Sequence, residues 1–274
     1  MGLRVNTNLF SLDAQRNLAN VTSRLSGNFA RLSSGLRIAS ASDDAAGLGI
    51  SERMRAQIRS LNQAGRNTQD GISLVQTAEG SLGELSGNLT RMRELAVQAA
   101  NGTLNTGDRA VLDGEFQALV AEIDRVAGQT TFNGVTLFDG ATTSVAIQVG
   151  AESGETISIS LQDSTAGGLG LSVANFDLTS VTNASAALDL IDTAVDTVST
   201  FRGDLGAIQN RLQSAFRSIS STSEHLSAAE SRIRDVDIAS ETADLTRNTI
   251  LQQASLSVLA QANVQPQLAL SLLG

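Results

Sequence analysis

A heptad pattern in the second half of the chain restricts the possible folds more than any other feature. From Ala184 to Val236, apolar residues recur at alternating steps of three and four, with Thr222 as the polar exception. Such a repeat, kept for about seven heptads, is typical of an α-helix that packs along other helices. At about 1.5 Å per residue the helix is roughly 80 Å long, so we expect other long helices beside it. The seam positions are Ala184, Ala187, Ile191, Ala194, Val198, Phe201, Leu205, Ile208, Leu212, Ala215, Ile219, Thr222, Leu226, Ala229, Ile233 and Val236.

Two further seams supply the partner helices. The second seam has one four-four step at Thr68 and stops before the turn-forming pair Asn101-Gly102. The third is shorter and ends at Gly128. Together the three seams predict an elongated, antiparallel helical bundle of the mainly α class. The second seam comprises Leu61, Ala64, Thr68, Ile72, Val75, Ala78, Leu82, Leu85, Leu89, Met92, Ala96 and Ala99, and the third Leu112, Phe116, Leu119, Ile123 and Val126.

A small β-hairpin region is expected at about 129–183. Apolar and polar residues alternate over 145–149 and 157–161, and the turn-rich loop 150–155 separates the two runs. This is the pattern of a hairpin, and Phe132-Asn133-Gly134 marks a second turn. The rest of 140–183 is rich in Gly, Ser and Thr. We therefore expect it to form an exposed surface, too short for an additional domain.

The two ends of the chain are amphipathic and are expected to pair as a two-helix coiled coil. The C-terminal residues from Leu268 to Leu273 are mostly leucine, which is unusual because terminal residues normally fray in water. Burial of each Leu or Val stabilises by roughly 1.5–3 kcal/mol, so we expect the ends to contact neighbouring subunits. The residues assigned to this assembly are Val5, Leu9, Leu12, Leu18, Val21, Leu25, Leu32, Leu251, Ala254, Val258 and Leu259.

The domain organisation follows from these elements. Residues 1–44 and 237–274 are predicted to form the two halves of the terminal coiled-coil domain, and residues 45–236 the bundle. Asp43-Asp44 is interpreted as an N-cap with first-turn charge rather than as a metal site. The segment from Ser40 to Gly49 is a joint between the two domains.

Composition excludes several functional classes. The net charge of −9 argues against nucleic-acid binding. The absence of cysteine excludes thiol catalysis and Cys-type zinc sites, and the single histidine, His225, has no second histidine as a partner. No apolar stretch approaches the length needed for membrane insertion, and no secretory signal is present. We expect no enzyme activity and no cofactor.

Local sequence strings closely resemble those of bacterial flagellins. They occur in the family's order, and they cover both ends and the bundle. Only about 140–183 is unmatched in detail. The matching strings are Val5-Asn6-Thr7-Asn8, Arg31-Leu32-Ser33-Ser34-Gly35-Leu36-Arg37-Ile38, Asp43-Asp44-Ala45-Ala46-Gly47-Leu48, Arg93-Glu94-Leu95-Ala96-Val97-Gln98, Ile250-Leu251-Gln252-Gln253-Ala254 and Val258-Leu259-Ala260-Gln261-Ala262-Asn263.

The resemblance implies a short flagellin, the secreted structural subunit of the extracellular flagellar filament used for motility. In that family the terminal coiled coil lines the inner channel of a homo-polymer. The subunit leaves the cell unfolded through the flagellar type III export apparatus, with an export chaperone, a filament cap protein and hook-associated junction proteins as partners. Related alternatives are a hook–filament junction protein, an adhesin, and an enzyme displayed on a flagellar scaffold. The last would need a catalytic cluster within 140–183, which has no His, Cys, Lys or Arg.

The resemblance also implies a receptor site. Flagellins of many bacteria are detected by a vertebrate Toll-like receptor through an Arg, a Leu and a Glu, which by local alignment correspond to Arg91, Leu95 and Glu115. Arg91 and Leu95 are four residues apart and therefore share one helix face. The same residues could serve contacts between protofilaments, and the two roles are compatible. We expect the monomer to activate the receptor and the intact filament to hide this surface.

Overall fold

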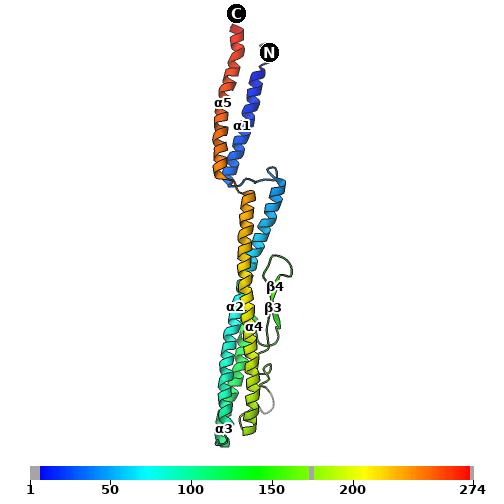
Figure 1. Ribbon diagram of the computed structural model, residues 1–274, viewed down its shortest axis with the longest axis vertical. Coiled ribbons are helices and arrows are strands. Elements are labelled where there is room, and N and C mark those ends of the chain that lie inside the picture. Colours follow the sequence, from blue (N-terminus) through cyan, green and yellow to red (C-terminus); the bar gives the residue numbers. More distant parts are fainter. Residues whose placement is uncertain (1–6, 173–175, 272–274) are drawn as a thin grey trace. The chain divides into compact units, whose positions relative to one another are not determined.

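The computed structural model describes the backbone of residues 7–172 and 176–271, with side chains to Val264 (Figure 1). Within these residues the chain forms five helices and two short hairpins, so the mainly α prediction is confirmed. The helices are α1 (Leu9–Ser34), α2 (Ala45–Ala99), α3 (Thr106–Gln129), α4 (Val181–Arg234) and α5 (Ile238–Ser271). The strands are β1 (Thr131–Phe132), β2 (Val135–Thr136), β3 (Ser144–Gln148) and β4 (Thr156–Ser160).

The chain divides into two compact units. One comprises Gln57–Glu224, and the other combines Met1–Ala56 with His225–Gly274. Both boundaries fall inside the long helices α2 and α4 rather than at their ends. The sequence-based division at 44/45 and 236/237, which follows the helix ends, stays a prediction.

The heptad seams form the core of the bundle unit, as predicted. On α2 every seam position is buried except Ile72, which is half-buried, and the irregular step at Thr68 lies in a continuous buried stripe. On α4 the seam is buried from Ala184 to Ile219, apart from the half-buried Ala215. From the predicted seam of α3, Phe116 and Ile123 are fully buried in this core. Beyond Ile219 the predicted seam is not buried, since Thr222 is exposed and Leu226, Ala229, Ile233 and Val236 are half-buried. Within the bundle unit the long helices are therefore held by packing along the buried stripes rather than by helix propensity alone.

The turn between α2 and α3 is stabilised by polar groups at the helix ends. Asn105 caps α3, and its side chain and that of Asp108 form a reciprocal capping box. Arg109 is only 9% exposed. It donates from Nε to the Ala99 carbonyl at 2.9 Å and from Nη2 to the Asn101 carbonyl at 2.9 Å. The Arg109 guanidinium donates hydrogen bonds to carbonyls that have no partner within α2. Its positive charge also interacts favourably with the negative C-terminal end of the α2 helix dipole.

Both predicted β-turns are present. β3 and β4 pair antiparallel with Ile147 opposite Ile157 and Val145 opposite Ile159, so the hairpin is confirmed. β1 and β2 are joined by Asn133 and Gly134, whose φ angles of 49° and 80° are those of a tight hairpin turn. The β3–β4 hairpin lies against α2 at Gly71, where an added Cβ would come within 3.1 Å of Ile147. Glycine at this position permits the close approach.

The segment 161–178 differs from its prediction as an exposed surface. Among its described residues, six apolar side chains are buried in the core of the bundle. The helix α3 holds the segment in place, because Asp113 accepts from the N–H of Leu178 at 2.9 Å and Asp124 accepts from the N–H of Ala166 at 2.8 Å. Leu161 continues the predicted strand alternation, but the other five side chains follow neither a helical nor a strand period, so the prediction of exposure was wrong for them. The buried side chains are Leu161, Ala166, Leu169, Leu171, Phe176 and Leu178.

Candidate interaction surfaces

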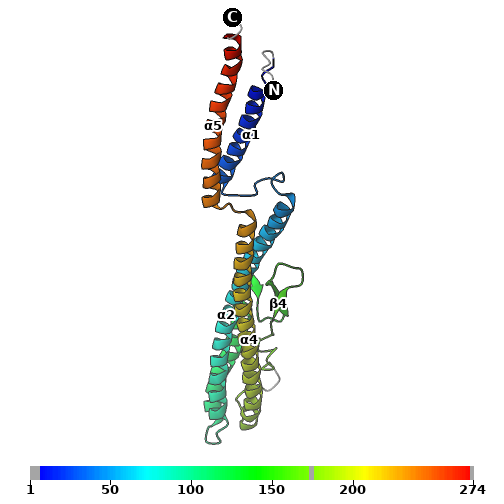
Figure 2. The same cartoon turned by 45° about the horizontal axis from the view of Figure 1, so that its top comes forward.

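In the terminal unit α1 and α5 lie side by side and run antiparallel (Figures 1 and 2). The stripe of α1 that faces α5 repeats every three or four residues, and its buried positions include Ser11 and Asn28 as well as Ala14 and Val21. On α5, Glu241, Asn248 and Ala262 are buried. Leu18, Leu25, Leu32 and Leu259 are half-buried at the same spacing. The contact is thus a heptad seam in which polar residues occupy several core positions.

Hydrogen bonds tie the two helices together at both ends of this seam. Asn8 donates to the Ala262 carbonyl at 2.7 Å, and the Ser11 hydroxyl donates to Asn263 Oδ1 at 2.8 Å. Asn28 and Asn248 are joined at 3.4 Å. The seam therefore combines apolar side chains with polar contacts near its ends, and other apolar side chains of the two helices remain exposed.

The exposed large apolar side chains of the two helices are distributed around them, and together we call them the outward apolar face: Leu9, Phe10, Leu12 and Phe29 of α1 with Ile238, Ile250, Leu251, Leu256, Val258 and Val264 of α5. Phe10 is 59% exposed and Leu251 41%. A groove of about 560 Å³ on α1, lined in part by Leu9 and Leu12, belongs to this face. So many exposed large apolar side chains on one pair of helices indicate a surface that a partner covers.

The predicted assembly residues therefore separate into two groups. Leu18, Val21, Leu25, Leu32 and Leu259 lie in the α1–α5 seam. Leu9, Leu12, Leu251, Ala254 and Val258 are exposed, and Val5 lies outside the described residues. Sequence periodicity did not separate the groups, because polar residues such as Asn28 and Asn248 do not look like core positions.

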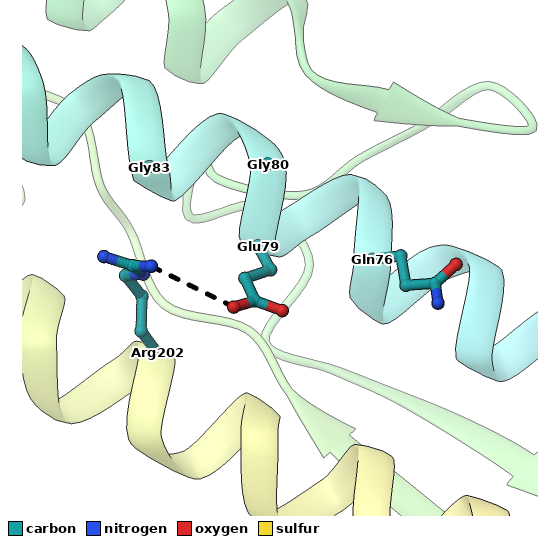
Figure 3. A pocket seen from close by; sticks show the side chains of 5 residues that line it. All are labelled: Gln76, Glu79, Gly80, Gly83 and Arg202. Carbon is teal, nitrogen blue, oxygen red and sulfur yellow. Dashed lines mark ion pairs between the residues drawn. The ribbon is translucent and has the colours of Figure 1, made fainter.

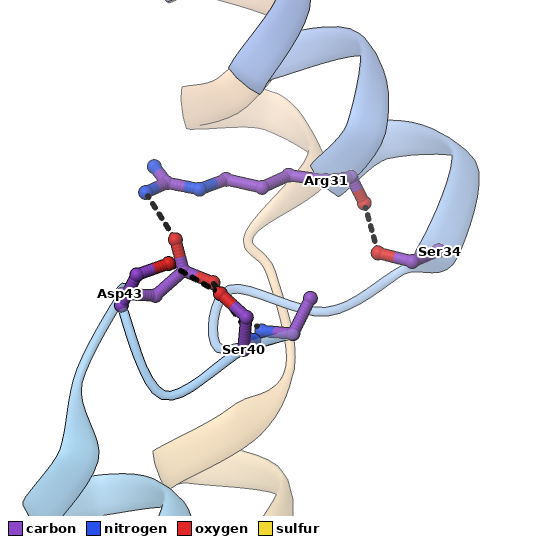
Figure 4. Close-up of polar contacts among 6 residues, drawn as sticks. Arg31, Ser34, Ser40 and Asp43 are labelled. Atoms are coloured by element: carbon purple, nitrogen blue, oxygen red, sulfur yellow. Dashed lines mark hydrogen bonds and ion pairs between the residues drawn. The ribbon is translucent and has the colours of Figure 1, made fainter.

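The connection between α1 and α2 is held by Asp43 (Figure 4). Its carboxylate accepts from the backbone N–H and the hydroxyl of Ser40, at 2.9 and 3.0 Å, and lies 4.0 Å from the Arg31 guanidinium. These hydrogen bonds from Ser40, with one from the Ala39 N–H, lower the pKa of Asp43. The neighbouring Asp44 accepts from the N–H of Gly47 at 2.9 Å, which is N-cap geometry. Asp44 is thus the predicted cap, whereas Asp43 closes the preceding turn.

The second connection, between α4 and α5, crosses the first. Leu36 and Asp235 form an antiparallel bridge, flanked by a hydrogen bond from the Arg37 N–H to the Arg234 carbonyl at 2.7 Å. The Arg234 guanidinium reaches Glu52 of α2 at 2.6 Å. That hydrogen bond lowers the pKa of Glu52. Arginine side chains therefore fasten both crossing segments.

The three predicted receptor residues lie close together in the bundle unit but differ in accessibility. Arg91 donates from Nε and Nη2 to Glu115 at 2.8 and 2.7 Å, and from Nη1 to Glu94 at 2.9 Å. The hydrogen bonds from Arg91 to Glu115 and then to Glu94 raise the pKa of Arg91. Leu95, by contrast, is 1% exposed and belongs to the core. Its position on α2 turns toward the seam, so only Arg91 and Glu115 offer their side chains to a partner.

A shallow groove lies between α2 and α4. It has a volume of about 410 Å³ and is lined by Gln76, Glu79, Gly80, Gly83 and Arg202. Figure 3 shows Arg202 reaching from α4 toward Glu79 on α2, at 3.9 Å. This lining holds no nucleophile with an adjacent base. In the described residues no group of three or more acidic or histidine side chains is placed to hold a metal, and no described helix is long and apolar enough to cross a membrane.

Comparison with known proteins decides what kind of protein presents these surfaces. Residues 5–143 match the bacterial flagellin N-terminal helical region, and residues 188–273 match the bacterial flagellin C-terminal helical region. The chain belongs to the bacterial flagellin family. It is 51% identical to the flagellin of Halalkalibacterium halodurans, over 98% of this chain and 99% of that one. It is 43% identical to the flagellin of Bacillus subtilis, over 99% of this chain and 100% of that one.

Solved structures agree with this assignment. The crystal structure of Bacillus cereus flagellin is similar with a TM-score of 0.51 at 35% identity, covering 60% of this chain and 94% of that chain. A putative flagellar hook-associated protein from Vibrio parahaemolyticus has a TM-score of 0.59 over 70% of this chain and 100% of that chain. At 17% identity the latter shows a shared fold alone. The much higher identity to flagellins favours the filament subunit over the junction protein.

Membership in this family defines the class of function. Flagellins are structural proteins that polymerise into the extracellular flagellar filament, and they are not enzymes. The chain is therefore a flagellar filament subunit.

Proposed function

We propose that the outward apolar face of α1 and α5 is the surface through which copies of this chain polymerise. One observation carries the proposal. Of the fifteen large hydrophobic side chains that are exposed in the described part of the chain, ten lie on α1 and α5. The contact between α1 and α5 leaves these side chains exposed. Copies packed side by side would bury them instead, at roughly 1.5–3 kcal/mol for each large side chain.

Seeded polymerisation of the purified chain tests this proposal. Sedimentation and electron microscopy are expected to find long helical filaments, with the amide protons of α1 and α5 protected from exchange in the filament and unprotected in the monomer. Equal protection of these two helices in both states would contradict the proposal, because the neighbours would then add nothing to their stability.

The route out of the cell is also a proposal. The resemblance to flagellins supports export of the unfolded chain through the flagellar type III apparatus, with an export chaperone, a cap protein and hook-associated junction proteins as partners. The cysteine-free sequence is compatible with such a route, since no disulfide would have to form. In cells lacking the export gate, immunoblotting is expected to find the chain only in the cytoplasm. Its appearance in the medium of such cells would exclude this route.

A second candidate function is recognition by the flagellin-sensing Toll-like receptor. Arg91 and Glu115 support it, because they form an exposed ion pair that joins α2 to α3. Exposed arginines paired in a rigid geometry are frequent centres of protein interfaces. Leu95 would contribute only by shaping the helix beneath them, since its side chain is buried.

Replacing both Arg91 and Glu115 by alanine tests the receptor site. We expect the receptor response to monomer to fall about 30-fold, as for the loss of an interface hot spot of about 2 kcal/mol. The measurement is a cell reporter assay over a concentration series. The matched control is Arg93→Ala with Asp192→Ala, which removes another exposed ion pair, at 2.6 Å between α2 and α4. An unchanged response from the first variant, or an equal loss from the control, would reject the assignment.

A further inference from the structure

The loop between α2 and α3 contains one of the two Asn-Gly pairs of the chain, Asn101-Gly102. The other pair is Asn133-Gly134. Asn101 and Gly102 are both exposed and lie between the two helices, outside regular secondary structure. The two pairs have the same two residues, but their structural surroundings differ, because Asn101-Gly102 lies in a loop and Asn133-Gly134 in a hairpin turn.

The geometry around Asn101 favours attack on its side-chain carbonyl. The N–H of Thr103 donates to Asn101 Oδ1 at 3.2 Å, so a donor already faces the oxygen on which negative charge would develop. Within the described residues no hydrogen bond engages the N–H of Gly102, which leaves that nitrogen free to act as the nucleophile. Gly102 has no side chain to obstruct the approach, and a Cβ built there meets no atom within 4 Å.

The backbone carbonyl of Asn101 is also held in place. It accepts from Arg109 Nη2 at 2.9 Å and from the N–H of Leu104 at 3.3 Å. These contacts keep Asn101 in one arrangement while its side chain stays on the surface. Because Asn101 and Gly102 are exposed, solvent base and water can reach the reacting atoms.

We propose that Asn101 is a site of intramolecular deamidation. The nitrogen of Gly102 loses its proton to solvent base and attacks Asn101 Cγ, forming a C–N bond. The Asn101 amide nitrogen then departs with a proton from solvent as ammonia, which leaves a five-membered succinimide. Water opens this ring at either of its two carbonyls and yields aspartate or isoaspartate. No oxidant or reductant is needed, and water is the only co-reactant.

The second pair, Asn133-Gly134, is in a less reactive setting. Both residues have positive φ angles, 49° and 80°, and they sit in a two-residue turn whose flanking residues Phe132 and Val135 are paired. Closure of a succinimide there would require the turn to leave this conformation while the hairpin opposes the movement. The structure thus assigns the faster reaction to Asn101.

Modification of Asn101 would change the end of the bundle unit in two ways. An aspartate adds a negative charge beside the C-terminus of α2, where a helix dipole disfavours it, although the Arg109 guanidinium is close enough to offset that effect. An isoaspartate inserts an additional methylene into the backbone and displaces the carbonyl that Arg109 binds. Isoaspartate is therefore expected to loosen the loop more than aspartate does.

Incubation of the purified full-length monomer at neutral and mildly alkaline pH tests the proposal. Peptide mass spectrometry follows the mass increase that accompanies replacement of NH2 by OH, and fragmentation distinguishes isoaspartate from aspartate. We expect conversion at Asn101 to be at least about tenfold faster than at Asn133, with both products present at Asn101. Conversion is expected to accelerate with pH, because the attacking nitrogen must lose a proton.

Two variants make the test specific. Gly102→Ala fits the available space, and it is expected to slow conversion at Asn101 about tenfold by restricting the backbone and crowding the nitrogen. Asn101→Gln should abolish the signal at this position and leave the rate at Asn133 unchanged. The proposal is overturned by equal rates at the two pairs, by aspartate without isoaspartate, or by an unaltered rate in Gly102→Ala.

Discussion

Filament formation is expected to be lost when Phe10 and Leu251 are both replaced by serine. Both side chains belong to the outward apolar face, one on each helix of the terminal pair. If each is buried by a neighbour in the filament, their loss removes roughly 3–6 kcal/mol from each subunit addition. Since about 1.4 kcal/mol corresponds to a factor of ten, the critical concentration should rise about 140-fold to 20,000-fold.

The monomer of this variant should remain folded. Phe10 and Leu251 are exposed in the chain, so the melting temperature of the bundle unit is expected to stay unchanged in calorimetry. Seeded polymerisation followed by sedimentation and electron microscopy gives the assembly result. Val135→Ser with Val181→Ser is the matched control, because it removes two exposed apolar side chains outside the terminal helices. Normal filaments from the Phe10 and Leu251 variant would show that the outward face is not the polymerising surface.

Phe116→Ala is expected to destabilise the bundle unit by about 3–5 kcal/mol. Phe116 is fully buried, and its ring lies 4.9 Å from that of Phe176 between centroids. The substitution leaves a cavity and removes the aromatic contact between α3 and Phe176 of the segment 161–178. At about 2–4 °C for each kcal/mol in a unit of this size, the melting temperature should fall by about 6–20 °C.

Calorimetry and limited proteolysis measure this effect. We expect earlier cleavage within 161–178 as well as a lower melting temperature, because Phe176 loses its partner. The control is Phe29→Ala, the same change at a side chain on α1 that is 57% exposed, for which almost no shift of the bundle transition is expected. A loss below about 1 kcal/mol in Phe116→Ala would mean that the segment is held by its hydrogen bonds to α3 rather than by this packing.

The bundle was the most predictable part of the fold. A helix that packs along other helices must repeat an apolar residue every three or four positions, so the stripe from Ala184 to Ile219 can be recognised from the order of its residues alone. The hairpin was predictable for the same reason, since Ile157 and Ile159 alternate with polar residues at the period of a strand. In both cases the buried side chains must recur at the period of the helix or strand, so the spacing of apolar residues shows which side chains are buried.

The candidate surfaces were less predictable. Whether an apolar residue of a terminal helix is buried or exposed depends on which side of that helix packs against the other one. The composition of the helix does not show which side this is. Leu95 shows the same difficulty within the bundle. It lies four residues from the exposed Arg91, yet it turns far enough to be buried. One helical turn does not return to the same angle, so shared spacing did not guarantee shared exposure.

The sequence by itself determined that the chain forms long amphipathic helices at both ends and through the bundle, because periodic apolar positions can be satisfied only by helices packed lengthwise. The tertiary structure alone decided which side chains those helices bury and which they present. Asn28 meets Asn248 across the α1–α5 seam, whereas Phe10 and Leu251 of the same two helices stay exposed. Such pairings join residues more than 200 positions apart in the chain. The spacing of apolar residues within one helix does not predict these pairings, since it depends only on residues within a few turns of that helix.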